Sequence, residues 1–110
     1  MNLFSDIRDR VIAAIAELQA AGQLPAGLDL SAVAVEPPRD AAHGDMATNA
    51  AMVLAKPANL PPRAIAEALV QHLLADPRLA AAEVAGPGFL NLRLAPQVWP
   101  RLLQQVLTLG

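Results

Sequence analysis

The sequence predicts an α+β domain in which a small antiparallel sheet of three to four strands is packed against about four helices. Three observations lead to this fold class. Apolar residues recur at spacings of three and four over residues 3–18, as in an amphipathic helix. Two short stretches with strand character flank residues 86–88, Gly-Pro-Gly, as in a β-hairpin. Further helical stripes lie between these two regions and after the hairpin.

Length and composition indicate a single domain, residues 1–110, with a core of its own. A chain of this size buries somewhat under about 70% of its unfolded surface. Alanine supplies much of the 55% apolar content, and no stretch reaches the roughly 18 apolar residues of a membrane span. The N-terminus lacks the basic start and apolar run of a signal peptide, and cysteine is absent. We therefore expect a cytoplasmic protein in a reducing compartment, with no membrane partner.

The charge balance argues against a protein that holds nucleic acid through charge alone. The formal net charge is -2, whereas sequence-independent affinity comes from cations that neutralise phosphates. No acidic residue follows Glu83, and Arg93 and Arg101 give the last 27 residues a formal charge of +2. This asymmetry is compatible with an anionic partner, but by itself it indicates two solvated arginines on a polar face.

The first third of the chain predicts a long helix and a strand. The amphipathic helix runs from about residue 2 to residue 21, and Gly22 is expected to end it in a left-handed conformation. After a loop, residues 32–35, Ala-Val-Ala-Val, predict a strand that Pro37-Pro38 stops, because proline cannot donate to a sheet.

Two shorter helices are predicted next. Asp45 is expected to cap the first at its N-terminus, and Lys56-Pro57 to end it. Pro61-Pro62 begin the second, since proline is tolerated in a first turn, and Asp76-Pro77 close it. The apolar positions of these helices are Met46, Ala50, Val53 and Leu54, then Ile65, Leu69 and Leu73.

Residues 82–94 carry the most informative pattern. Two strands, 82–85 and 89–94, flank the three-residue Gly-Pro-Gly loop of an antiparallel hairpin. Strict alternation in the second strand places Leu90, Leu92 and Leu94 on one face, which we assign to the core. Pro96 then opens a final helix. Its apolar stripe comprises Val98, Trp99, Leu102, Leu103, Val106 and Leu107.

Phe89, Asn91 and Arg93 occupy the opposite, outward face of the same strand. An aromatic ring stacks on an unpaired base, an amide pairs with a base edge, and a guanidinium holds a phosphate. Single-stranded or looped RNA invites these contacts, so the three side chains are the candidate RNA-binding residues. The alternative from periodicity alone is that Phe89 covers an edge of the core and the two polar residues are simply solvated.

The sequence contains no complete catalytic, metal or cofactor motif. His43-Gly44-Asp45 places a histidine near a carboxylate, but no serine or cysteine nucleophile is nearby. A small hydrolase or isomerase built on His43 and Asp45 would require a concave pocket around them. His72 lies near a buried helical stripe and is expected to be structural rather than a metal ligand. The Gly-Pro-Gly segment lacks the third glycine and following helix of a dinucleotide fingerprint.

Two stretches resemble the N-terminal appended domain of bacterial arginyl-tRNA synthetases: residues 43–52, His-Gly-Asp-Met-Ala-Thr-Asn-Ala-Ala-Met, and residues 84–91, Val-Ala-Gly-Pro-Gly-Phe-Leu-Asn. The order and spacing of the other elements agree, so the resemblance covers essentially the whole chain. It implies a domain that lies against the outer corner of tRNA and contacts the D-loop. Phe89 and Asn91 are then the positions where the family meets a D-loop base. The eukaryotic form adds a polar residue just before the hairpin glycine, where this chain has Ala85.

The same resemblance implies an arginine-tRNA ligase as the parent protein, with a class I catalytic domain downstream. Signatures of the His-x-Gly-His and Lys-Met-Ser-Lys-Ser types are absent from residues 1–110. ATP and arginine would therefore bind the catalytic domain, and this chain alone would be inactive in aminoacylation. The expected partners are tRNA and that catalytic domain; we expect no metal and a monomeric state. The alternative is a protein interaction or dimerisation module, in which the helices at either end dock a partner or a second copy.

Overall fold

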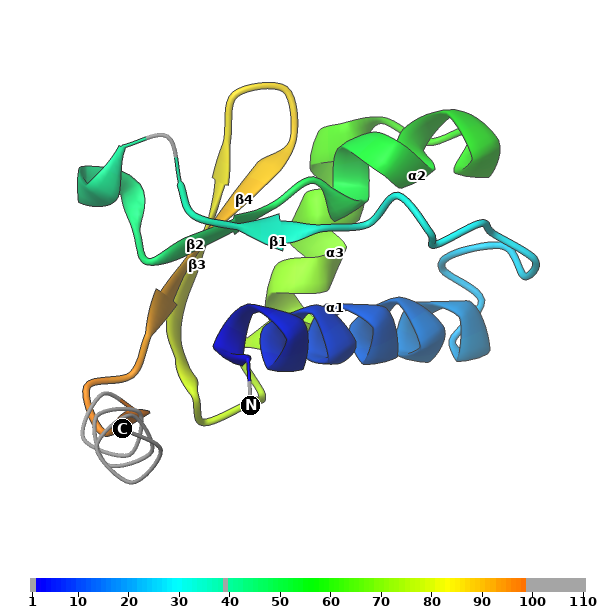
Figure 1. The fold of residues 1–110 in the computed structure, drawn as a ribbon. Coiled ribbons are helices and arrows are strands. Elements are labelled where there is room, and N and C mark those ends of the chain that lie inside the picture. The colour runs from blue at the N-terminus through cyan, green and yellow to red at the C-terminus, as the bar shows by residue number, and fades with distance from the viewer. Residues whose placement is uncertain (1, 39, 99–110) are drawn as a thin grey trace.

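The computed structural model describes residues 2–38 and 40–98. Its elements are α1 (Leu3–Ala20), β1 (Val35–Glu36), the 3-10 helix η1 (Ala41–His43), β2 (Met46–Thr48), α2 (Ala50–Ala58), α3 (Pro62–Leu73), β3 (Leu79–Ala85) and β4 (Phe89–Leu94). The strands form one antiparallel sheet in the order β1-β2-β4-β3 (Figure 1). The predicted α+β class is confirmed. The helix predicted after Pro96 lies almost entirely outside the described residues.

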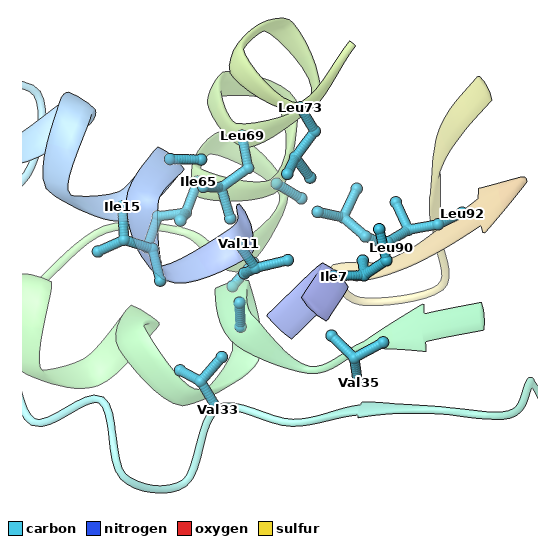
Figure 2. Close-up of a cluster of buried hydrophobic side chains, with 14 of the residues drawn as sticks. Ile7, Val11, Ile15, Val33, Val35, Ile65, Leu69, Leu73, Leu90 and Leu92 are labelled. Carbon is cyan, nitrogen blue, oxygen red and sulfur yellow. The ribbon is translucent and has the colours of Figure 1, made fainter. Parts of the chain in front are cut away.

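The hydrophobic core joins the inner face of the sheet to α1, α2 and α3. Leu90 and Leu92 of β4 are fully buried and lie in one cluster with side chains of α1 and α3 (Figure 2). The apolar stripe of α1 is buried in the same cluster, which confirms the predicted amphipathic helix.

The ends of α1 follow the local sequence. The Asn2 side chain caps the helix, since its Oδ1 accepts the Phe4 N–H at 2.9 Å. Gly22 has a φ of 78° directly after the helix, and its N–H donates to the Gln19 carbonyl. The predicted left-handed glycine at the end of α1 is therefore confirmed.

The strand predicted over residues 32–35 is displaced: β1 covers only Val35–Glu36. The reason is the Asn49 side chain. Its Oδ1 accepts the Ala34 N–H at 2.8 Å, and its Nδ2 donates to the Ala32 carbonyl at 3.1 Å. The backbone before β1 is therefore satisfied by an amide side chain from another part of the chain instead of by a neighbouring strand.

The prediction that a helix begins directly after Asp45 is also wrong. Residues 46–48 form β2, which pairs with β4, and α2 begins only at Ala50. Asp45 is bound to the sheet and does not cap a helix. Its N–H donates to the Leu92 carbonyl and its Oδ2 accepts the Leu94 N–H, both at 2.8 Å. The N-cap preference of aspartate is thus overridden by pairing with a strand distant in sequence.

The boundary between α2 and α3 agrees closely with the sequence. Helix α2 continues one residue beyond Pro57 and is followed by Asn59 in a left-handed conformation, with a φ of 55°. Its predicted end at Lys56-Pro57 is therefore slightly early. Helix α3 begins at Pro62, after Pro61 at the N-cap position, which confirms the predicted start.

An ionic cluster links α1 to the C-terminal end of α3. Arg10 of α1 donates to the His72 carbonyl at 2.7 Å and lies 3.2 Å from Glu17 Oε1. His72 Nδ1 lies 3.4 Å from the same Glu17 oxygen, so the His72 side chain takes part in the contact between α3 and α1. After α3, Asp76 accepts hydrogen bonds from Arg78 and its Oδ2 lies 3.7 Å from Arg10 Nε.

The Asp76 carboxylate is expected to make stability depend on pH in the acid range. Hydrogen bonding from Arg78 holds the pKa of Asp76 below its ordinary value of 3.8. The stabilisation is therefore complete above the unfolded-state pKa and is lost as pH falls through the folded-state pKa. At neutral pH, Asp76→Asn should cost about 1.5–3 kcal/mol, the range for hydrogen bonds to charged groups. Urea denaturation at a series of pH values measures both effects.

Asp9, an exposed acid on α1, supplies the matched control. Asp9→Asn should change the free energy of unfolding by under about 0.5 kcal/mol. Equal losses in the two variants at neutral pH would contradict the role given to the Asp76–Arg78 pair.

Candidate nucleic-acid interface

The outward face of β4 carries the three residues selected from the sequence. Exposure alternates along the strand: Phe89 is 39% exposed, whereas Leu90 and Leu92 are fully buried. Asn91 is half-buried and Arg93 is exposed. The pleat therefore presents a ring, an amide and a guanidinium on the side of the sheet away from the leucines.

Alanines lie beside each of these three residues on a neighbouring strand and leave space next to the row. In the register of the sheet, Ala85 of β3 lies opposite Phe89, and Ala81 lies opposite Arg93. Asn91 lies between Ala47 of β2 and Glu83 of β3. Since an alanine side chain ends at Cβ, the Phe89 ring stands above Ala85, and the Asn91 amide stands above Ala47.

A hollow of about 170 Å³ adjoins Phe89 and Asn91. We call it the β3-side hollow. It is lined by His43, Ala47, Ala85, Gly86, Phe89 and Asn91. Its volume is below the roughly 300 Å³ at which pockets for drug-sized ligands begin, so it suits one flat heterocycle better than a larger ligand. An aromatic face and an amide edge meet in this hollow.

His43 reaches the hollow because the chain before β2 lies directly against β4. Gly44 has a φ of 145°, and a Cβ at this position would lie 2.7 Å from the Leu92 carbonyl oxygen. Only glycine permits this approach without displacement. Arg93 also holds this segment against β4, since its Nη2 donates to the Ala42 carbonyl at 3.1 Å.

Arg93 lies apart from Phe89 and Asn91, the other two candidate RNA-binding residues. The structure brings Phe89 and Asn91 to the β3-side hollow, but Arg93 is not among the residues that line it. Its guanidinium holds the segment that carries His43. An arginine has five N–H donors, so others remain for an external acceptor.

Arg63 is a cation near the site that sequence reasoning missed. It is exposed in the first turn of α3, and its Nη1 donates at 2.6 Å to the carbonyl of Gly86, which lines the hollow. No spacing in the sequence indicated this, because residues 63 and 86 belong to different elements. The structure brings them together because Gly88 packs against Pro62, which precedes Arg63.

A second hollow, of about 200 Å³, lies on the other side of Phe89, toward β1 and β2. We call it the β1-side hollow. It is lined by Ala34, Glu36, Pro37, Ala47, Thr48, Asn49 and Phe89. Phe89 and Ala47 thus belong to both hollows.

His43 and Asp45 differ in their position relative to the β3-side hollow. His43 lines the hollow and Asp45 does not, and none of the lining residues is a serine, threonine, cysteine or lysine. The Asp45 Oδ2 accepts the Leu94 N–H of the sheet. Over residues 2–38 and 40–98 no three metal-binding side chains come together, and no helix has the length and hydropathy of a membrane crossing.

The sheet has helices on one face and an aromatic side chain beside an amide on the other, which defines a small α+β domain with one open sheet face. The profile of the family described as arginyl tRNA synthetase N terminal domain matches residues 5–94. The chain belongs to this family, as its resemblance in sequence predicted.

Full-length relatives carry this sequence as a short segment. An arginine-tRNA ligase of Cereibacter sphaeroides is 71% identical over 110 residues, which are all of this chain and 19% of that protein. The ligase of Rhodospirillum rubrum is 64% identical over the same coverage. The structure of Thermus thermophilus arginyl-tRNA synthetase superposes with a TM-score of 0.68 at 24% identity, covering 91% of this chain and 15% of that one. This likeness confirms the fold.

Proposed function

We propose that the chain is the part of an arginine-tRNA ligase that contacts the D-loop at the outer corner of tRNA(Arg). It helps to recognise the tRNA and to position it for aminoacylation with arginine. The observation that carries the proposal is the exposed Phe89 ring, which adjoins Asn91 over a hollow of heterocyclic size. Family membership and the names of the relatives support the same assignment.

An unpaired base enters the β3-side hollow, where it stacks on Phe89. Stacking of this kind contributes about 1–3 kcal/mol per base. The Asn91 amide has both donors and an acceptor for the base edge. Arg93 supplies remaining donors to a phosphate of the RNA backbone, and Arg63 offers a second cation beside the hairpin.

The interaction is weak by itself and becomes effective within a larger protein. The net charge is -2, and Glu36 and Glu83 lie in the same cross-strand row as Asn91, so phosphate attraction is limited. When the chain is joined to a catalytic domain that also binds tRNA, binding of the D-loop becomes intramolecular. In that cytoplasmic enzyme the catalytic domain binds ATP and arginine, and this chain contributes tRNA placement.

The direct test is titration of the ¹⁵N-labelled chain with an RNA hairpin of the tRNA(Arg) D-arm, with the anticodon-arm hairpin as reference. We expect amide shifts in β4, η1 and the hairpin for the D-arm only. Asn91→Ala should weaken binding about tenfold, within the range for loss of one bidentate base contact. Gln71→Ala, which removes an exposed amide from α3, should leave the affinity unchanged. Equal shifts with both hairpins would contradict the proposal.

A further inference from the structure

We infer that this face binds two consecutive unpaired nucleotides, one in each hollow, with the Phe89 ring between them and Glu36 selecting a base that carries an amino group. The inference rests on the proposed function and extends it to a second nucleotide. Phe89 and Ala47 line both hollows, whereas the other lining residues differ. The β3-side hollow adds Ala85 and Gly86; the β1-side hollow adds residues on and around β1 and β2.

The two hollows lie side by side on the sheet: the β3-side hollow extends across β4, from Ala47 of β2 to Ala85 of β3, and the β1-side hollow extends from Phe89 across β2 to β1. Neighbouring strands lie about 4.8 Å apart, so a base over β4 and a base over the β1–β2 pair are separated by about 7 Å. A ring that stands between two bases offers each of them one face. Other RNA-binding sheets stack two or three successive bases on several aromatic side chains, whereas here the single Phe89 ring serves both bases.

The β1-side hollow has one polar group that is suited to read a base. The Asn49 amide is engaged at both ends, by Ala34 N–H and by the Ala32 carbonyl. The Thr48 hydroxyl donates to the Ala34 carbonyl and accepts the Ala50 N–H. Glu36 differs, because it lies on the exposed outer face of β1.

The chemistry of Glu36 determines which base fits. An ionised carboxylate accepts hydrogen bonds and does not donate them. Adenine, cytosine and guanine present an exocyclic amino donor, whereas uracil has no amino group and its single N3–H lies between two carbonyl oxygens that a carboxylate repels. The same negative charge repels phosphate, so the base and not the backbone occupies this hollow. The second nucleotide is therefore an adenosine, a cytidine or a guanosine.

The test uses the 110-residue chain with nucleoside monophosphates and dinucleoside monophosphates as probes, measured by amide shift titration. UpU is compared with CpU and UpC, which place the amino-bearing base on either side of the linkage. We expect one order to bind about tenfold more tightly than UpU, the ratio that one good base contact provides. Glu36→Gln should abolish this preference.

Two alanine-to-leucine substitutions fill one hollow each. Ala34 faces outward between the buried Val33 and Val35, and a side chain there leaves its backbone bonds to Thr48 and Asn49 intact. Ala34→Leu should reduce dinucleotide affinity to that of a mononucleotide and leave mononucleotide binding unchanged. Ala85→Leu should weaken both. Preserved amide spectra establish that each variant is folded.

The outcomes separate this inference from the proposed function. If Ala34→Leu and Glu36→Gln leave dinucleotide binding unchanged while Ala85→Leu weakens it, one base is bound, so the inference is overturned and the proposed function stands. If the wild-type chain binds none of the probes, or Ala85→Leu and Phe89→Ala leave binding unchanged, both fail.

Discussion

Replacing Phe89 with alanine is expected to weaken binding of the D-arm RNA by about 5- to 150-fold, the effect of losing 1–3 kcal/mol of stacking. The reason is positional. The ring is 39% exposed, adjoins two hollows and is absent from the core cluster, so its removal takes away a binding surface and little of the core packing. The free energy of unfolding should change by under about 0.5 kcal/mol.

The same substitution should lower kcat/KM for tRNA charging in a full-length enzyme. A suitable enzyme is the Cereibacter sphaeroides ligase with its matching segment replaced by this chain, since the two are 71% identical. Because the proposed D-loop contact involves tRNA and neither ATP nor arginine, we expect KM for tRNA to rise while KM for ATP and arginine does not change.

Two matched variants control for this prediction. Phe89→Tyr keeps the stacking face and should retain affinity. Leu60→Ala removes an apolar side chain of nearly equal exposure, 38%, outside both hollows, and should have no effect. Equal loss in Leu60→Ala and Phe89→Ala, or no loss in either binding or charging, would remove Phe89 from the interface.

Gly88→Ala is expected to destabilise the fold by about 2–5 kcal/mol through backbone strain and overpacking together. Gly88 has a φ of 147°, and a Cβ at this position would lie 2.6 Å from Pro62 Cβ and 3.0 Å from Pro62 C. The hairpin must move away from the start of α3, which should also disturb the bond between Arg63 and Gly86. Thermal unfolding should show a midpoint lower by about 10 °C or more.

Gly27→Ala separates strain from the steric contact. Gly27 also has a positive φ, of 77°, but a Cβ there would meet nothing within 4 Å. It should cost only about 1–2 kcal/mol, the penalty for a left-handed residue with a side chain. A loss in Gly88→Ala no larger than in Gly27→Ala would show that the hairpin does not depend on close packing against Pro62.

Periodicity determined the elements whose contacts are local. The three-and-four spacing of α1, the proline start of α3 and the alternation of β4 each act within a few residues, and the structure agrees with all three. For the same reason the sequence identified the outward face of β4, with Phe89 and Asn91 on it. Each residue in a strand projects opposite to the next one, whatever its partner strand.

Pairing between distant segments overturned two local predictions. Asp45 has the chemistry of a helix cap, yet it forms hydrogen bonds with Leu92 and Leu94 of β4 and directly precedes β2. Residues 32–34 have strand propensity, yet the Asn49 side chain forms hydrogen bonds with the Ala34 N–H and the Ala32 carbonyl in place of a neighbouring strand. In both cases a partner far along the chain satisfies the backbone, and propensity is too weak a preference to resist it.

By itself, then, the sequence determined the family, the fold class and the face of the sheet that carries the ring and the amide, because these follow from motifs and short-range periodicity. Only the tertiary structure decided what surrounds that face. It brought His43 and Ala85 to one side of Phe89, Glu36 and Ala34 to the other, and Arg63 to the hairpin. The register between strands creates these neighbours, and register depends on contacts that no local window of sequence contains.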